Sequence, residues 1–271
     1  MRLINRRPSR AVKIVLTLIP FVLVLIAYGV GSHLRRLENP SDKLLPAPGQ
    51  IMETAWRLAT APDRRSGDIL LWVDTAASLE RLGLGIGLAA ILGLVFGLLI
   101  GLLPLVRANL AHFVSALSLI PPLAILPILF IIFGLGEASK IALITIGVAP
   151  FLIRDMAQRV LEIPTEQIIK AQTLAANTWI IAIRVVLPQI MPRLIQGIRL
   201  GLGPAWLFLI AAEAIASQDG LGYRIFLVRR YLAMDVILPY VVWITLLAYI
   251  IDWGLRRLSE KMFPWAGEGG L

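Results

Sequence analysis

The chain has 271 residues, of which 58% are hydrophobic and 16% are charged, and its formal net charge is +9. A soluble domain has about a quarter of its residues charged, so this composition excludes an ordinary soluble domain and indicates several membrane crossings. The chain has no cysteine, and its two histidines, His33 and His112, lie far apart without acidic partners at ligand spacing, so we expect no metal site.

Six apolar stretches approach the roughly 20 residues that a helix needs to cross a hydrocarbon core about 30 Å thick. They are residues 12–31, 82–103, 111–133, 141–152, 197–216 and 236–255. The fourth is short because Arg154 and Asp155 end its apolar run, so we expect it to take up residues from the preceding loop or to lie tilted. The sequence therefore predicts an all-α membrane protein with about six transmembrane helices.

The basic residues follow the ends of the predicted spans instead of gathering on one face among aromatic residues, so we expect no nucleic-acid partner. By the positive-inside rule, the regions rich in Lys and Arg lie in the cytosol, which places both termini there. Residues 32–81 carry seven basic and seven acidic residues, and we expect this long loop outside the cell membrane. The basic positions are Arg2, Arg6, Arg7 and Arg10; Arg107; Arg154, Arg159, Lys170, Arg184, Arg193 and Arg199; and Arg256, Arg257 and Lys261.

These assignments divide the chain into four parts. Residues 1–31 form a cytosolic N-terminus and an uncleaved first transmembrane helix, and residues 32–81 form an extracytoplasmic loop with a short helix. Residues 82–255 form the transmembrane core, which includes a cytosolic loop at 154–196. Residues 256–271 form a cytosolic tail.

The second predicted span carries small residues along one helix face. Gly93, Gly97 and Gly101 recur every four residues, after Gly83, Gly85 and Gly87. This spacing lets another backbone approach closely, so we expect the helix to pack tightly against a neighbour.

The third predicted span contains Pro121, Pro122 and Pro127. Each proline removes a backbone hydrogen bond, so we expect a kinked or broken helix. Two interpretations stay open: a packing kink, and a helix that lines a translocation path and bends as a gate.

A polar stretch, residues 164–192, separates two apolar spans. Pro164 and Thr165 can start one short helix, with the proline preset for the first turn and the threonine able to cap it, and Asn177 can cap a second that runs up to Pro188. Two short helices at an angle form a knob. It either rests on lipid headgroups or docks into a cytosolic protein.

Glu213 lies near the outer end of the fifth predicted span, where a carboxylate is costly. It is either partly solvated, or it serves as a gate or as the partner of an arginine such as Arg224. Direct contact with an anionic solute is less favoured, because the two negative charges repel each other.

The stretch 168–179, followed by Leu187-Pro188 and Pro192, resembles the signature cytoplasmic loop of ABC-type importer permeases, in which Glu-Ala-Ala, three residues and Gly precede Ile-x-Leu-Pro. Ala171, Leu174, Ala176 and Leu187-Pro188 match this pattern. Ile169 stands in place of its Glu, Lys170 in place of its first Ala, and Ala175 in place of its Gly. Further motifs are similar to the taurine, nitrate and sulfonate branch: Ala77-Ser78-Leu79 with Arg81, Ile120-Pro121-Pro122-Leu123-Ala124, Phe133-Gly134-Leu135-Gly136, Ala211-Ala212-Glu213 and Gly220-Leu221-Gly222.

The resemblance implies a type I ABC importer permease fold in the bacterial inner membrane. It implies two permease copies, expected to be a homodimer, with cytosolic ABC ATPase subunits and an extracytoplasmic substrate-binding protein as partners. The chain itself is expected to be no enzyme and to bind no cofactor, with ATP-Mg bound by the ATPases. The expected ATPase-coupling residues are Glu166, Ile169, Lys170, Ala171, Leu174, Ala175, Ala176, Asn177, Trp179 and Pro188, and the expected path or gate residues are Pro121, Pro122, Pro127 and Glu213.

The solute implied by this branch is a small organic anion such as taurine or another sulfonate, with nitrate, bicarbonate or a vitamin precursor as alternatives. A membrane-embedded enzyme acting on lipids is a different class of function, and it would need polar catalytic residues converging at a membrane face, which the sequence does not reveal. A sensor or assembly partner would be expected to carry a sizeable soluble domain.

Overall fold

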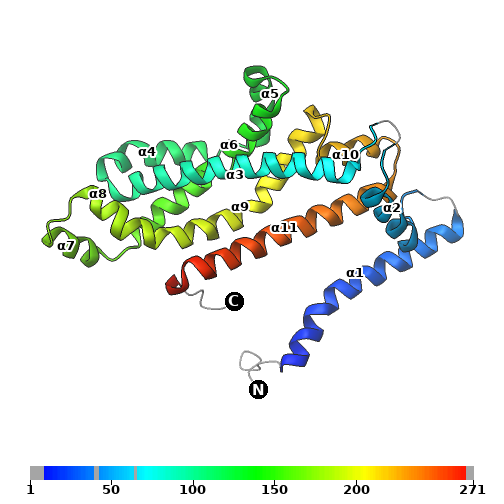
Figure 1. Ribbon diagram of the computed structural model, residues 1–271, viewed down its shortest axis with the longest axis horizontal. Coiled ribbons are helices and arrows are strands. Elements are labelled where there is room, and N and C mark those ends of the chain that lie inside the picture. The colour runs from blue at the N-terminus through cyan, green and yellow to red at the C-terminus, as the bar shows by residue number, and fades with distance from the viewer. Residues whose placement is uncertain (1–8, 40–42, 64–65, 267–271) are drawn as a thin grey trace.

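The computed structural model describes residues 9–39, 43–63 and 66–266, which form helices and loops without a strand among them (Figure 1). The predicted basic positions Arg2, Arg6 and Arg7, and residues 267–271 of the predicted tail, lie outside the described residues. The helices are α1 (Arg10–Glu38), α2 (Pro48–Thr60), α3 (Leu70–Leu102), α4 (Pro104–Leu117), α5 (Pro122–Phe133), α6 (Glu137–Leu161), α7 (Thr165–Thr173), α8 (Thr178–Ile180), the π-helix η2 (Ile181–Val186), α9 (Leu187–Ala216), α10 (Leu221–Arg229), α11 (Met234–Met262) and the 3-10 turn η3 (Pro264–Ala266).

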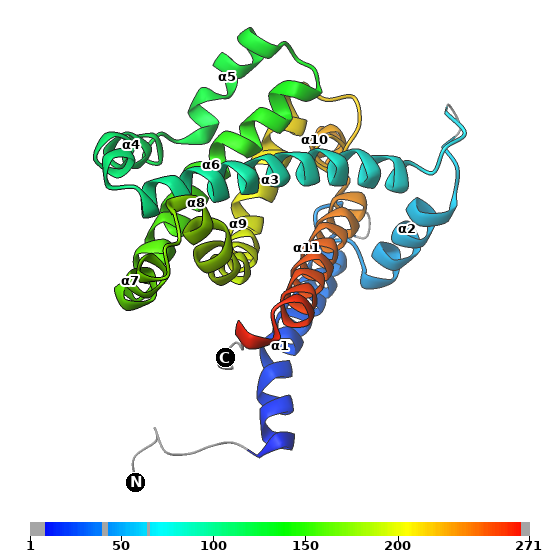
Figure 2. The ribbon, with the colours of Figure 1, turned by 60° about the vertical axis from the view of Figure 1, so that its left-hand side comes forward.

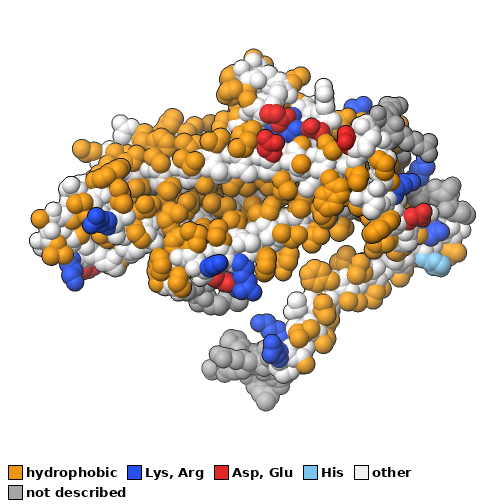
Figure 3. All heavy atoms as spheres, in the orientation of Figure 1, with side chains coloured by type: hydrophobic (Ala, Val, Ile, Leu, Met, Phe, Trp, Pro, Cys, Tyr) orange, Lys and Arg blue, Asp and Glu red, His pale blue; other side chains and the backbone are white. Residues whose placement is uncertain are grey.

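The body of the molecule is built on α3, α6 and α9. α3 packs along α6, and α6 packs along α9, while α11 lies against α9 and α2 (Figure 2). The short helices α7 and α8 lie at one end of this body, and α2 and α10 lie at the opposite end (Figure 1). Its surface in this view is mostly hydrophobic, and the charged side chains lie in a few separate groups (Figure 3). This pattern suits a body surrounded by lipid.

Among the described residues, five helices are long and apolar enough to cross a membrane, and the bent pair α4 and α5 supplies a sixth if it is counted as one span. The predicted number of spans agrees with this. The fourth span is longer than its apolar run, because α6 continues through Arg154 and Asp155 to Leu161. Both charged groups have partners, since Arg154 donates to the Ser118 hydroxyl and Asp155 pairs with Arg159 one turn later. α3, which contains the second predicted span, also starts earlier than predicted, at Leu70 instead of residue 82.

The third predicted span, 111–133, is broken. α4 and α5 meet at an angle of 95°. Pro121 and Pro122 follow the end of α4, and Pro122 occupies the first turn of α5, where its missing N–H costs nothing. The predicted break is therefore confirmed.

Small residues on α3 allow its close packing against α6. A Cβ at Gly85 would lie 2.6 Å from the Cβ of Ile144, and a Cβ at Gly93 would lie 2.7 Å from the Cβ of Leu152. Gly97 and Gly101 meet Met156 and Val160 in the same way, while Gly83 and Gly87 face open space. The predicted helix contact is therefore confirmed for the four glycines on one face of α3.

The first helix lies apart from the body (Figure 1). Its polar attachments to the following loop come from Tyr28, whose hydroxyl donates to the Pro46 carbonyl at 2.7 Å, and from Ser32, whose hydroxyl donates to the Leu45 carbonyl at 3.0 Å. Most of its apolar side chains are exposed. This surface is suited to lipid or to another membrane subunit.

Candidate functional site

The knob consists of α7 and α8, which link the end of α6 to the start of α9 (Figure 1). Asn177 caps α8, because its side-chain oxygen accepts from the backbone N–H of Ile180 at 2.8 Å, as predicted. Pro164 occupies the capping position of α7 without a side-chain hydrogen bond, and Thr165 is its first helical residue. The expectation that Thr165 caps this helix is therefore wrong.

The second helix of the knob does not end at Pro188. α8, η2 and α9 form one continuous helical stretch from Thr178 to Ala216. The π-helical turns of η2 immediately precede this proline, and the N–H of Leu187 bonds to the carbonyl of Ala182. A proline cannot donate to the residue four positions before it, and a π-helical register is one way for a helix to continue around such a defect. The knob is thus joined rigidly to a membrane-length helix.

A small core attaches the knob to the membrane helices. Val160, Ile163, Ile181, Val186 and Ile190 are buried together, and Leu94, Leu98 and Leu102 of α3 pack against them. Ala171 and Ala176 are half-buried beside this core.

The loop between α7 and α8 is a Schellman motif. The N–H of Ala176 bonds to the Ala171 carbonyl at 3.0 Å, and the N–H of Ala175 bonds to the Gln172 carbonyl at 2.9 Å. Ala175 has φ of 60°, in the left-handed region that glycine adopts without strain. An alanine with this φ adds backbone strain of about 1 kcal/mol or more. The same position is occupied by Gly in the importer-loop pattern.

The outward side of the knob exposes large apolar side chains. Leu174 is 76% exposed, Trp179 is 70% exposed and Ile169 is 52% exposed. Glu166, Lys170, Ala175, Asn177 and Pro188 are exposed as well. Large exposed apolar side chains on a polar segment indicate a contact surface for another protein or for a membrane.

A second polar cluster lies at the opposite end of the body. Arg81 of α3 is buried, and its Nη1 donates to Glu213 Oε1 of α9 at 2.8 Å. Its other nitrogens bond to the carboxylates of Glu137 and Asp219. One guanidinium therefore joins α3, the start of α6, the end of α9 and the loop that follows.

Glu213 is fully buried and every oxygen of its carboxylate is satisfied. Besides Arg81, it accepts from the Ser78 hydroxyl at 2.8 Å and from the Gly222 N–H at 2.8 Å. The expected partial solvation is wrong. The expected arginine partner is present, but it is Arg81 and not Arg224. Close packing around the carboxylate excludes water, and Arg224 is engaged elsewhere.

Arg224 of α10 pairs with Asp74 of α3, with Nε and Oδ2 at 2.8 Å. Asp74 is fully buried and also accepts from the Tyr240 hydroxyl and from the Gly220 N–H, each at 3.0 Å. Burial by itself would lower the pKa of Arg224, but its hydrogen bond and charge interaction with Asp74 outweigh this, so the pKa is raised. The guanidinium stays charged.

Gly220 completes the loop between α9 and α10. Its φ is 108°, and a Cβ there would lie 2.5 Å from the carboxyl carbon of Glu213. A side chain at this position would therefore collide with the ion pair and would also strain the backbone.

Asp74, Ser78 and Arg81 belong to none of the sites predicted from the sequence. Their spacing of four and then three residues puts three polar side chains on one face of a helix, and this periodicity is the signal that could have found them. Their partners Glu213 and Arg224 lie more than 130 residues further along the chain.

The bundle of membrane-length helices with a polar knob at one end defines an integral membrane permease. A solved structure of the inward-facing MetNI methionine ABC transporter matches this fold with a TM-score of 0.63 at 24% identity, covering 71% of this chain and 95% of that chain. The fold is that of a type I ABC importer permease. The family described as the binding-protein-dependent transport system inner membrane component matches residues 89–264, and the chain belongs to this family.

Relatives include permeases from several organisms. The taurine transport system permease protein TauC of Escherichia coli is 37% identical over 233 residues, covering 86% of this chain and 84% of that protein. The putative aliphatic sulfonates transport permease protein SsuC of Bacillus subtilis is 29% identical, covering 92% and 86%. The nitrate import permease protein NrtB of Leptolyngbya laminosa is 27% identical, covering 88% and 86%. The chain is thus an inner-membrane subunit of an ABC importer.

Proposed function

We propose that two copies of this chain form the translocation path for a small solute that carries a sulfonate, with taurine as the first solute to test. The permeases named for taurine, aliphatic sulfonates and nitrate are similar to this chain over most of its length. Their named solutes share a compact, negatively charged group of oxygen atoms. Nitrate, bicarbonate and a vitamin precursor are the alternative solutes.

The exposed apolar knob is the observation that carries the mechanism. Leu174, Trp179 and Ile169 form a surface that a cytosolic ATPase subunit can cover, and η2 and α9 connect this surface to the far side of the membrane. At 1.5 Å per residue, the 30 residues of α9 span about 45 Å. When the ATPases close on ATP, a displaced knob would move α9 as a lever and change which side of the path is open.

The remaining elements fit this arrangement. Both termini lie in the cytosol, ATP-Mg is held by the ATPase partners, and an extracytoplasmic binding protein delivers the solute at the end that carries Arg81 and Glu213. α5, which follows the break at Pro121 and Pro122 and contains Pro127, presents exposed apolar residues such as Ile131 that a second copy can cover. The buried state of Glu213 favours a role as an outer clamp over contact with the solute.

The test is reconstitution of the full chain with the ATPase that co-purifies with it and with its binding protein in proteoliposomes. We expect ATP-dependent uptake of radiolabelled taurine. A complex that hydrolyses ATP and transports nitrate or bicarbonate instead would refute the solute assignment and leave the permease role intact. A chain that purifies alone, under conditions that preserve other such complexes, would contradict the proposed partners.

A further inference from the structure

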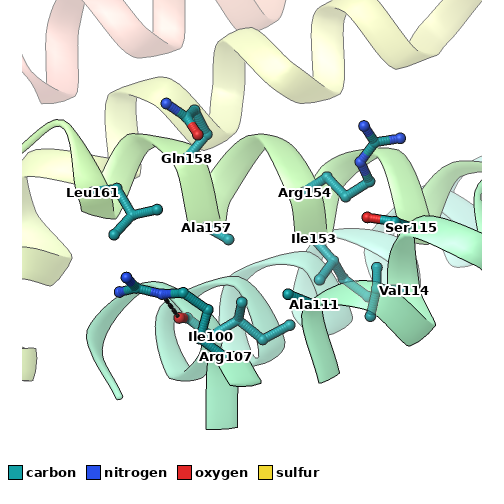
Figure 4. Close-up of a pocket in the computed structure, with 10 residues that line it drawn as sticks. All are labelled: Ile100, Arg107, Ala111, Val114, Ser115, Ile153, Arg154, Ala157, Gln158 and Leu161. Atoms are coloured by element: carbon teal, nitrogen blue, oxygen red, sulfur yellow. Dashed lines mark hydrogen bonds between the residues drawn. The ribbon is translucent and has the colours of Figure 1, made fainter. Parts of the chain in front are cut away.

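A cavity of about 190 Å³ lies between α4 and α6, close to the end of α3 (Figure 4). Its polar lining comes from Arg107, Ser115, Arg154 and Gln158, and no carboxylate lines it. Arg154 lies roughly 10 Å along α6 before the end of this helix at Leu161, so the cavity is in the half of the membrane nearer the knob.

Arg154 has no acidic partner within the described part of the chain. Its Nη1 donates to the Ser118 hydroxyl at 2.8 Å, which leaves its other N–H groups available. The neighbouring carboxylate of Asp155 pairs with Arg159 instead. Arg154 is exposed, so a ligand, water or a lipid headgroup can reach its free N–H groups.

Arg107 brings a second positive charge to the opposite end of the cavity from Arg154 (Figure 4). Its Nε donates to the Ile100 carbonyl at 3.1 Å, and its Nη2 donates to the Gly101 carbonyl, so it caps the end of α3. These carbonyl bonds fix the position of the guanidinium without neutralising its charge.

The two neutral polar side chains that line the cavity are available for hydrogen bonding to a ligand. The amide of Gln158 and the hydroxyl of Ser115 make no side-chain hydrogen bond within the residues that the structure describes. Figure 4 shows Ser115 next to Arg154 at one end of the cavity. Arg154 and two free neutral donors along this space, with Arg107 adding positive charge at its far end, match the needs of an oxyanion, because guanidinium groups bind sulfonate and phosphate oxygens through charge-assisted hydrogen bonds.

We propose that this cavity binds an oxyanion, with Arg154 as its principal cationic ligand. The oxyanion is either the sulfonate of a solute or the phosphate of a lipid headgroup. In the first case the site deepens the proposed function, since it would be a station for the solute on the inward half of its path.

The test uses the absence of cysteine from the chain. A Gln158→Cys variant of the full chain is purified in dodecyl maltoside micelles, which carry no phosphate, and its rate of reaction with N-ethylmaleimide is followed by mass spectrometry. Methanesulfonate is the free oxyanion probe, methanesulfonamide is its uncharged match, and phosphatidylglycerol added to the micelles is the lipid probe. Lys261→Cys, on the exposed last turn of α11, is the control for general effects on reactivity.

Slower labelling at position 158 with methanesulfonate, and not with methanesulfonamide, would support the site with a free sulfonate as its ligand. Slower labelling with phosphatidylglycerol alone would support the site with a lipid phosphate as its ligand. Protection by neither probe would overturn the proposal.

Adding Arg154→Gln to the Gln158→Cys variant should raise the concentration of the protecting probe that is needed to slow labelling by roughly tenfold or more, as expected for the loss of a charge-assisted hydrogen bond. Arg154→Lys should retain part of the protection, which shows that charge is needed, and Arg184→Gln on the exposed face of η2 should retain all of it. Undiminished protection in Arg154→Gln would refute the role of Arg154. Because labelling requires neither ATP nor transport, this result is independent of the uptake experiment that tests the proposed function.

Discussion

Arg81 of α3 and Glu213 of α9 form a buried ion pair at 2.8 Å, near the end of α9 that is farthest from the knob. Breaking a buried pair by removing one partner leaves an uncompensated charge, which destabilises a protein by roughly 3–5 kcal/mol. Here Arg81 keeps Glu137 and Asp219 as partners, so the loss is smaller. This pair joins two helices that cross the whole body, and its loss should loosen their outer ends.

Glu213→Ala should lower the free energy of unfolding by about 2–3 kcal/mol, because Arg81 and Ser78 lose their shared acceptor. Glu213→Gln should lower it less, since the amide oxygen still accepts hydrogen bonds. Denaturant unfolding of the purified chain in detergent measures both. Asp252→Ala, which removes the half-exposed partner of Arg199, is the comparison and should cost about 1 kcal/mol or less.

Leu174→Asp should abolish binding of the ATPase subunits without lowering the thermal stability of the purified chain. Leu174 is 76% exposed, so the new carboxylate is solvated in the isolated chain and is desolvated only under a docked partner. Co-purification of the ATPase with the tagged chain is the measurement. Leu105→Asp is the matched control, since Leu105 is 86% exposed on α4 and lies outside the knob. Normal binding by Leu174→Asp would show that the knob is not the docking surface.

Ala175→Gly should stabilise the knob by roughly 0.5–1 kcal/mol. The gain arises because glycine adopts the φ of 60° without strain, and it is reduced by the greater backbone entropy of glycine in the unfolded chain. Hydrogen exchange of the α7 amides is a local measurement of this effect and should slow. Ala176→Gly should have the opposite effect, because Ala176 is half-buried beside the core of the knob and has no positive φ to relieve. Faster exchange in Ala175→Gly would contradict the strain at this position.

Gly93→Ala should destabilise the protein by about 1–3 kcal/mol, because the added methyl group would lie 2.7 Å from the Cβ of Leu152 and would push α3 away from α6. Gly87→Ala on the open face of the same helix should be neutral or slightly stabilising, since alanine favours a helix over glycine. Unfolding of both variants in detergent makes the comparison. Equal stability would mean that the contact between α3 and α6 adapts to the extra volume.

Most of the architecture could be predicted from local pattern. The apolar runs predict the number of spans because a hydrocarbon core about 30 Å thick demands a minimum length of apolar helix. Pro121 and Pro122 predict the break between α4 and α5, and the glycines of α3 predict a close helix contact. Asn177 predicts the start of α8, because an N-cap depends on residues only three positions apart.

The end of the knob was harder to predict, because Pro188 normally stops or kinks a helix. The π-helical turns of η2 absorb the missing hydrogen bond, and the buried contacts of Val186 and Ile190 hold α8 and α9 in one continuous stretch. Tertiary packing therefore overrode a local signal.

The sequence by itself determined that the chain is a bundle of membrane helices with a polar knob, because hydropathy, glycine and proline act over a few residues. Only the tertiary structure decided how the buried charges are paired. Arg81 pairs with Glu213, and Asp74 pairs with Arg224, because helix packing brings together groups more than 130 residues apart. A buried charge in the low-dielectric interior is stable only beside an opposite charge. The same packing placed Arg154 at a cavity where no acidic residue of the described chain pairs with it, which its position in the chain could not reveal.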